Sequence, residues 1–477
     1  MSLSETTKVL AGAAALAVVA TSANAAGADP QSRIDALQQQ IDELSAQVTD
    51  LKRSTSNQYA DMKNQPPPEA ALSLKGGRPT FQSADGGFSL AIRALVQYDT
   101  AYYSQEKAPA GVDFSSGGNF RRARLGVQGM LFKDWSYQFI YDFGGSGTEG
   151  ASISSAYIQY DGLAPLHWKI GAYAPPESFD DSTSASDLLF LERAQPADLA
   201  RGIAGADGRD ATTLFAYDDD YFAALSYTGD SVQDSGVFDE QQALVGRVAY
   251  RLFGGGDANF AVGGDSSYVF ELAQTAPGAG APSAIRLRER PELNVDDQNI
   301  RLIDTGSIDA SKVWEWGAEA AANWRNLYAQ GGYFGFAVTR RDSSLPNPSF
   351  GGWYAQASWV LTGESKAYVP STGSYTVPKP NEPFSLGKPG PGAWELAARY
   401  SDLDLNDGAG IAGLPTPLGG IRGGEQKIWT AGVNWYPNSA IRFQLDYQHT
   451  GVSRLSGAGG SLAAKLDAVS LRAQLSL

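Results

Sequence analysis

Cysteine is absent from the 477 residues, and the chain contains only two histidines and three methionines. Without cysteine it can form no disulfide, no thiolate metal site and no cysteine nucleophile. His167 and His449 are too few for a histidine-rich zinc site, and no catalytic motif surrounds either of them. We therefore expect no enzymatic activity and neither a bound metal nor another cofactor.

Long apolar runs are also missing, because no stretch reaches the roughly 18 residues that a membrane-spanning helix needs. Aromatic residues nevertheless make up 11% of the chain, and glycine occurs 54 times. Tyrosine and tryptophan suit the interfaces of a membrane, whereas glycine suits the turns and bends of curved sheets. The formal net charge of −15 argues against nucleic acid as a partner.

Alternation of apolar and polar residues is the dominant pattern, and it recurs in sixteen segments from Phe88 to Leu477. In the first segment, Leu90 and Ile92 lie on one face, whereas Arg93 and Gln97 lie on the other. Only helices and closed barrels satisfy their backbone groups inside lipid. The pattern therefore predicts an all-β fold, a 16-stranded antiparallel transmembrane β-barrel over residues 86–477. The expected strands are 88–98, 123–131, 135–143, 152–161, 167–173, 209–217, 221–229, 239–252, 258–272, 312–325, 327–340, 351–363, 392–404, 425–436, 440–450 and 465–477.

The connections between these segments alternate in length. Tight turns are expected at 133–134, 218–220, 326 and 437–439, and long loops at 174–208 and 273–311. Short periplasmic turns and longer external loops are typical of outer-membrane barrels. Residues 364–392 break this plan, because they are long where a short turn is due. An even number of strands places both termini on the periplasmic side.

The N-terminal region has a different organisation. Residues 1–25 have the features of a secretory signal peptide, with an apolar stretch and a small-residue cleavage site. Residues 29–53 carry a heptad repeat, which predicts a periplasmic coiled-coil helix, and 54–85 form a proline-containing linker. The apolar stripe of the helix consists of Ile34, Leu37, Ile41, Leu44, Val48 and Leu51. It could instead pack on the barrel rim or hold another component of the cell envelope.

Four segments, spread over the predicted barrel, resemble the phosphate-selective porin O/P family. They are Gly118–Gly126, Leu189–Arg193, Leu361–Glu364 and Gly392–Ser401. The resemblance implies a trimeric sixteen-stranded outer-membrane porin whose third external loop folds inward and narrows the pore. In this sequence that loop is 174–208. The resemblance also implies basic pore residues that favour anions.

Basic residues on the predicted inward faces are the candidates for transport, because a pore enriches an ion by lining its constriction with the opposite charge. The candidate anion-binding set is Arg93, Arg122, Arg124, Lys169, Arg193, Arg201, Arg247 and Arg399. Arg251, Arg442 and Arg472 also fall on inward faces. Alternatively, these cations pair with inward carboxylates and only stiffen the wall. The available partners are Asp99, Asp142, Glu192, Glu319, Glu395 and Asp446.

Acidic runs at 180–181, 218–220 and 296–297 lack the ligand spacing of a calcium loop, so we expect solvated carboxylates there. Tryptophans near the predicted strand ends indicate a girdle at the lipid interface rather than a sugar-binding track. The sequence thus predicts a bacterial outer-membrane porin for small anions, phosphate included. A general or cation-leaning porin remains the alternative, because the chain is acidic and few lysines face inward. The expected partners are the bilayer, lipopolysaccharide, two further copies in a homotrimer, and an envelope component held by the coiled coil.

Overall fold

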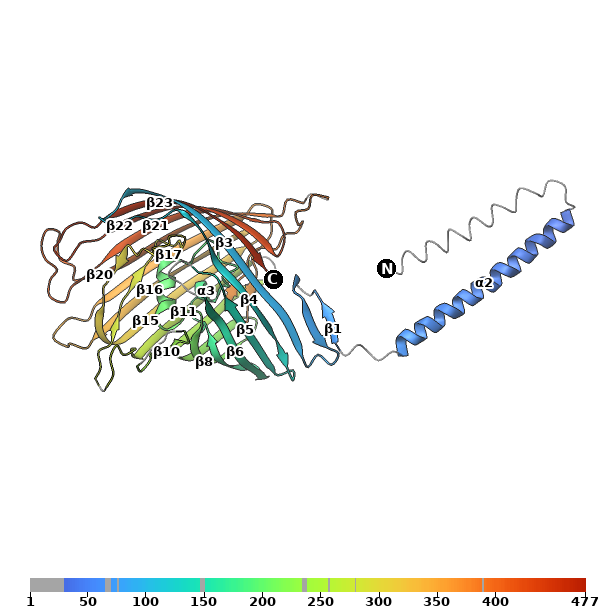
Figure 1. The fold of residues 1–477 in the computed structure, drawn as a ribbon, viewed down its shortest axis with the longest axis horizontal. Coiled ribbons are helices and arrows are strands. Elements are labelled where there is room, and N and C mark those ends of the chain that lie inside the picture. Colours follow the sequence, from blue (N-terminus) through green and yellow to red (C-terminus); the bar gives the residue numbers. More distant parts are fainter. Residues whose placement is uncertain are drawn as a thin grey trace. The chain divides into compact units, whose positions relative to one another are not determined.

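The computed structural model describes residues 30–64, 70–74, 77–145, 151–233, 238–255, 258–278, 280–387 and 390–477. The chain divides into two compact units, Met1–Glu69 and Ala70–Leu477 (Figure 1). The predicted signal peptide, residues 1–25, lies outside the described residues.

The second unit is built around a closed barrel of sixteen antiparallel strands. Each strand pairs with the barrel strands before and after it, and the last strand pairs with the first, so the sixteen strands form a closed ring. This confirms the predicted barrel. The barrel strands are β3 (Ser89–Lys107), β4 (Gly117–Leu131), β5 (Trp135–Asp142), β6 (Ser152–Leu163), β7 (Leu166–Tyr173), β8 (Arg209–Tyr217), β9 (Tyr221–Ser231), β10 (Gln242–Gly255), β11 (Ala258–Glu271), β15 (Ile308–Trp324), β16 (Leu327–Arg340), β17 (Ser349–Val360), β20 (Ala393–Asp407), β21 (Ile421–Tyr436), β22 (Ile441–Ser453) and β23 (Ala464–Ser476).

Most strand bounds agree with the alternation of the sequence to within a few residues, but β3 and β4 are much longer than expected. β3 continues to Lys107 instead of ending at residue 98, and β4 begins at Gly117 instead of residue 123. The reason is that Ala101 and Tyr103 face a packed interior, where they are buried. An apolar residue on the lumen face removes the contrast on which the alternation depends.

The two faces of the wall differ as a lipid face and a lumen face should. Leu125, Val248 and Trp429 are more than half exposed on the outside. In contrast, Gln97 and Thr450 are fully buried on the inside, with an exposed fraction of 0%. Seven further tryptophans are exposed on the outer surface: Trp168, Trp314, Trp316, Trp324, Trp353, Trp359 and Trp394.

A short hairpin precedes the barrel within the stretch expected to be a linker. β1 (Ala70–Ser73) pairs with β2 (Thr80–Ser83), and β2 pairs with the start of β3 through Thr80 and Ala91. β23 ends where its Ser476 pairs with Leu95, so β2 takes the place beside β3 that β23 leaves free. The hairpin therefore extends the wall beyond the C-terminal strand.

The first unit contains one long helix, α2 (Pro30–Asn64), which continues past residue 53, the predicted end of the heptad pattern. The six apolar heptad residues are all more than half exposed, from 52% for Val48 to 71% for Leu51. An apolar stripe that faces water is stabilised when it packs against another surface. We therefore still predict a partner for this face of α2. No helix among the described residues is long and apolar enough to cross a bilayer.

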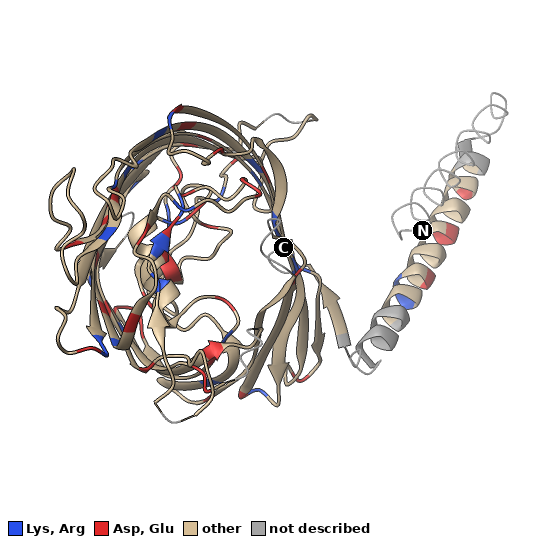
Figure 2. Cartoon of the chain, turned by 60° about the vertical axis from the view of Figure 1, so that its left-hand side comes forward, with Lys and Arg blue, Asp and Glu red and all other residues tan. Residues whose placement is uncertain are grey.

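Three segments fill much of the barrel interior (Figure 2). Two enter from the end that carries the long loops: residues 174–208 with α3 (Phe179–Ser182) and α4 (Gln195–Ala204), and residues 272–307 with β12 (Ala284–Ile285), β13 (Arg288–Glu289) and β14 (Ile303–Asp304). The third, residues 361–392 with β18 (Tyr368–Val369) and β19 (Ser374–Tyr375), enters from the turn end. Ser374 donates its hydroxyl to the carbonyl of Ser182, so the segments from opposite ends meet.

We expect the two faces of β4 to respond differently to an added charge. Leu125→Arg places a guanidinium on the lipid face and should lower the free energy of unfolding by about 2–4 kcal/mol. Gln128→Arg is the matched control on the lumen face of the same strand, where the cost should be small. Reversible urea unfolding in lipid vesicles measures both values. Equal losses in the two variants would contradict the assignment of the faces.

Candidate pore constriction

A β-bulge in β4 turns three arginines toward the interior. Gln97 of β3 pairs with Arg122, but Tyr98 pairs with Phe120, so Arg121 is the extra residue. Strict alternation from Leu125 would have placed Arg121 on the lipid side and Phe120 on the lumen side. Instead, Arg121 binds Glu192 inside the barrel, with Nε 2.7 Å from Oε1. A bulge is the expected way to keep a guanidinium out of lipid.

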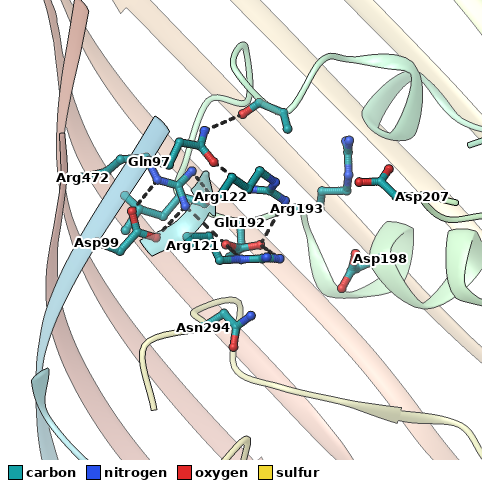
Figure 3. A network of polar contacts seen from close by, with 12 residues as sticks. Gln97, Asp99, Arg121, Arg122, Glu192, Arg193, Asp198, Asp207, Asn294 and Arg472 are labelled. Carbon is teal, nitrogen blue, oxygen red and sulfur yellow. Dashed lines mark hydrogen bonds and ion pairs between the residues drawn. The ribbon is translucent and has the colours of Figure 1, made fainter. Parts of the chain in front are cut away.

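Glu192 connects the inward loop 174–208 to this arginine group (Figure 3). Its carboxylate also lies 3.3 Å from Nη2 of Arg472 and 4.0 Å from Nη2 of Arg122. Burial alone would raise the pKa of Glu192, but the guanidinium groups of Arg121, Arg122 and Arg472 outweigh it and hold the pKa well below its usual value. Glu192 is therefore ionised at neutral pH.

Side chains of β22 and β23 hold the loop segment around Glu192 in place. Arg442 donates to the carbonyl of Leu188 at 2.7 Å, and Arg472 donates to the carbonyl of Leu191 at 2.7 Å. Asp446 accepts from the backbone N–H of Leu191 at 3.1 Å. These bonds satisfy backbone groups that the loop carries into the interior. They fix the position of the segment relative to the wall.

Two cavities adjoin at mid-height between this loop and the wall. The outer cavity, of about 460 Å³, opens toward the long loops, and the inner cavity, of about 280 Å³, lies toward the turn end. The residues that line both cavities are Arg122, Arg124, Arg193, Arg201 and Asp207. We call these five residues the neck, because they lie between the two cavities and line both.

Charges in the neck are paired across the gap between wall and loop. Arg124, from the wall, lies 2.7 Å from Asp142 and also contacts Asp207. Arg201, from the loop, lies 3.1 Å from Asp207 and 2.7 Å from Asp181. Burial opposes ionisation of Asp207, but Arg124, Arg201 and Arg122 lower its pKa far below the usual value. Asp207 therefore bridges the two sides as a carboxylate.

The two cavities differ in their balance of charge. Seven basic and six acidic side chains line the outer cavity, which is therefore nearly neutral. Six basic side chains but only two carboxylates, Asp181 and Asp207, line the inner cavity. The inner cavity thus carries a clear positive excess, which attracts anions and repels cations.

Arg93 and Lys169 are the basic residues of the inner cavity that have no carboxylate partner among the described residues. Lys169 instead lies over the rings of Tyr157 and Tyr173, with its Nζ 4.6 and 4.7 Å from the ring centres. Aromatic faces stabilise an ammonium group without neutralising it. Neither cation forms an ion pair with a described residue there, so both add positive charge to the inner cavity.

Arg247 and Arg399 of the predicted set lie elsewhere. Arg247 is buried against the segment from the turn end and donates to the carbonyls of Thr372 and Gly373 at 2.6 Å each. Arg399 binds the carboxylate of Glu292, which extends from the segment 272–307. Neither lines the two adjoining cavities. Six of the eight predicted residues therefore share one site, and these two hold inward segments in place.

The expectation of solvated carboxylates is wrong for two of the three acidic runs. Asp180 and Asp181 are buried and bind Arg193 and Arg201, at 3.1 and 2.7 Å. Asp296 is buried too and accepts from the backbone N–H and hydroxyl of Ser115. These carboxylates hold the inward loops, which strand periodicity cannot indicate. Residues 218–220 do form an exposed turn.

Arg121, Asp207 and Glu292 are the functional residues that the sequence analysis did not identify. For Arg121 a signal was present, because Phe120 and Leu125 are both apolar but lie an odd number of positions apart. Such a change of parity within one strand indicates a bulge. Asp207 and Glu292 carried no signal, because each lies in a long connection without periodicity.

This geometry defines a class of protein: a pore-forming β-barrel whose lumen is narrowed by an inward loop and lined by arginines. Residues 90–477 match the family of phosphate-selective porins O and P, and the chain belongs to that family. The chain is therefore a porin, and the fold and family place it in the bacterial outer membrane. They indicate a channel rather than an enzyme.

Two relatives and one solved structure illustrate the relationship. Porin O of Pseudomonas aeruginosa is 24% identical over 404 residues, which cover 82% of this chain and 89% of the relative. An uncharacterised protein of Caulobacter vibrioides is 26% identical over 407 residues, or 81% of this chain and 74% of the relative. The anion-selective porin from Comamonas acidovorans has the same fold, with a TM-score of 0.50, 13% identity, and coverage of 82% of this chain and 100% of its own.

Removal of the Glu192 carboxylate should loosen the inward loop. Glu192→Gln removes a largely buried charge that lies close to the guanidinium groups of Arg121, Arg122 and Arg472, and we expect a loss of roughly 3–5 kcal/mol in the free energy of unfolding. Because the pKa of Glu192 is lowered in the folded state, its contribution is complete at neutral pH and is lost as the pH falls below the ordinary carboxyl range.

Urea unfolding at neutral and at acidic pH measures this effect. The wild type should lose stability on acidification, whereas Glu192→Gln should lose less. Asp134→Asn, in the turn between β4 and β5, is the control and should behave as the wild type. A Glu192→Gln protein with unchanged stability at neutral pH would contradict the anchoring role.

Proposed function

We propose that the chain is a passive diffusion channel for small anions, phosphate included. The observation that carries this proposal is the positive excess of the inner cavity, where Arg93 and Lys169 stand without carboxylate partners. An anion that reaches the neck meets guanidinium groups whose planar forks suit two oxygens of a phosphate or carboxylate. The family to which the chain belongs and the anion selectivity of the Comamonas porin support the same direction.

The path runs from the outer cavity through the neck into the inner cavity. In the outer cavity the charges are nearly balanced, so an anion is not held there tightly. At the neck, Arg124 and Arg201 already share Asp207, which limits how strongly they bind a passing anion. Transport needs binding that permits entry and also release. Arg124 and Arg201 of the neck are paired with Asp207, so they bind an anion weakly enough to release it. Arg93 and Lys169 in the inner cavity attract the anion and so favour its entry.

A general or cation-leaning porin is the second candidate. The net charge of −15 and the carboxylates of the outer cavity favour it, since they attract cations to the mouth. The two candidates differ in the sign of the selectivity. They also differ in the residues that set it: Arg93 and Lys169 for anions, the acidic residues of the outer cavity for cations.

Reversal potentials across a planar bilayer in a salt gradient decide between the candidates. We expect the wild type to prefer chloride over potassium. The double variant Arg93→Ala/Lys169→Ala removes both free cations, and the preference should fall severalfold or vanish. The reason is that neither cation forms an ion pair with a carboxylate among the described residues.

Arg247→Ala is the matched control, because it also removes a lumenal arginine but one that lines neither cavity and donates to the carbonyls of Thr372 and Gly373. Its ion selectivity should stay close to that of the wild type. A wild-type pore that prefers potassium would contradict the anion proposal. A double variant with unchanged selectivity would contradict the assignment of its residues.

We further propose that the protein is a homotrimer with α2 as a periplasmic coiled coil. The exposed stripe of α2 supports this, because its spacing fits a seam between parallel helices. In the bilayer the outward apolar band contacts lipid, and the loop end adjoins lipopolysaccharide. An alternative role for the same stripe is to bind another component of the cell envelope.

The double variant Leu37→Asp/Leu44→Asp tests the coiled coil. Each aspartate places a charge in the seam, so trimers should dissociate at detergent concentrations that the wild type withstands. Gln38→Asp/Ser45→Asp adds the same charge beside the stripe and is the control. Sedimentation in detergent measures the assembly. Intact trimers together with loss of envelope attachment in cells would favour the tether.

A further inference from the structure

Three carboxylates come together inside the barrel, outside the two adjoining cavities. Glu177 belongs to the inward loop, Asp265 to β11 and Glu315 to β15. One oxygen from each lies within 4.8 Å of the others. The exposed fractions of the three residues are 0%, 7% and 0%, so water does not solvate the group. None of the acidic runs in the sequence contributes to it.

Most oxygens of this group have no hydrogen-bond donor. Ser267 donates its hydroxyl to Oε1 of Glu177 at 2.7 Å and its backbone N–H to Oε2 of Glu315 at 2.9 Å. Oε2 of Glu177, Oε1 of Glu315 and both oxygens of Asp265 are buried and accept no hydrogen bond from a donor group of the described residues, although the Asp265 and Glu315 carboxyls lie within hydrogen-bond reach of each other. Glu319, four residues after Glu315 on β15, differs in this respect. The Phe179 N–H and the Tyr354 hydroxyl donate to its two oxygens.

The cations near the group are engaged elsewhere. Arg247 stands directly across from Asp265 in the sheet, but it donates to the carbonyls of Thr372 and Gly373. Arg201 is bound to Asp181 and Asp207. Three ionised carboxylates this close repel one another, and burial adds the cost of desolvation. Burial also raises the pKa of Glu177 well above its usual value.

Small residues border the carboxylates and leave room around them. A Cβ atom at Gly317 would lie 2.6 Å from Oδ1 of Asp265, and one at Gly205 would lie 3.0 Å from Oε2 of Glu177. Larger side chains at these two positions would therefore collide with the oxygens that lack donors. The glycines preserve the space in which the carboxylates converge.

We propose that Glu177, Asp265 and Glu315 bind a calcium ion that ties the inward loop to the barrel wall. Calcium takes oxygen ligands at about 2.3–2.6 Å, so two of its ligands are at most about 5 Å apart, as these oxygens are. The carboxylates can bind through one or two oxygens each, which suits the flexible geometry of calcium. Magnesium is less suitable, because it keeps several waters and demands near-octahedral geometry.

The ion would complete the attachment of the loop. Arginines and Asp446 hold its middle, around Leu188–Glu192, to β20–β23. Glu177 lies near the start of the loop, on the side of β11 and β15. Calcium would thus fix the first part of the loop to the opposite half of the barrel. This site concerns the rigidity of the loop and does not depend on which ion the pore prefers.

The test uses the full-length protein in detergent, treated with a chelator and then supplied with calcium alone. We expect the wild type to bind a single calcium ion per chain and to unfold at a higher temperature with calcium than without. Glu315→Gln and Asp265→Asn should lower the calcium affinity by at least about tenfold, a loss that even supporting groups of metal sites cause. Asp446→Asn, another buried lumenal carboxylate, is the control and should bind calcium as the wild type does.

In the presence of the chelator, the wild type should lose its advantage in unfolding temperature over the carboxylate variants. Glu315→Gln should then unfold at a higher temperature than the wild type, because it has one fewer repelling charge. A calcium-free wild type whose unfolding temperature does not respond to added calcium would overturn the proposal. If the calcium-free wild type is also stabilised as the pH falls, the three carboxylates share protons and do not bind calcium. Reversal potentials of the same samples report on the pore separately, so failure of either proposal is recognised independently.

Discussion

Backbone carbonyls that are carried into a closed barrel need donors, and arginine supplies them here. Loop segments normally lie at the surface, where water satisfies their polar groups. In this porin, Arg442 and Arg472 donate to carbonyls of the loop 174–208, and Arg247 donates to carbonyls of the segment from the turn end. An apolar wall would leave these carbonyls unpaired, at a cost of about 1–3 kcal/mol each. The inward loops are stable because the wall is basic.

The same chemistry divides the inward cations into two groups. One group binds loop carbonyls or carboxylates and has a structural role; Arg399, held by Glu292, is an example. The other group faces water in the inner cavity, where Arg93 and Lys169 have no acidic partner. The number of arginines in the lumen therefore says little about selectivity. What matters is which of them keep their charge uncompensated along the path of the solute.

The wall was predictable from the sequence because its rule is local. Alternation reveals each strand wherever one face meets lipid and the other meets polar groups, and β8 and β16 have the predicted bounds. It fails where Ala101 and Tyr103 pack against a loop, since both faces are then apolar. It also fails at Arg121, where a bulge shifts the parity.

The site was only partly predictable. Inward orientation identified Arg93, Arg122, Arg124 and Lys169 correctly as residues of one cavity. Orientation could not tell them from Arg247, because the partner of Arg247 is a distant backbone carbonyl that has no sequence signal. The carboxylate group of Glu177, Asp265 and Glu315 was equally hidden. Its members come from three separate segments and form no motif.

The packed interior has an electrical consequence. The three inward segments replace water over much of the cross-section with protein of low dielectric constant, and they leave the neck as the connection between the two cavities. On the proposed path, a voltage across the membrane should therefore drop mainly over the neck, where Arg124 and Arg201 both contact Asp207. A solute outside the neck then experiences almost none of the voltage gradient, whereas a solute within the neck experiences nearly all of it. Small displacements of the loop should thus change the current more than movements elsewhere in the wall.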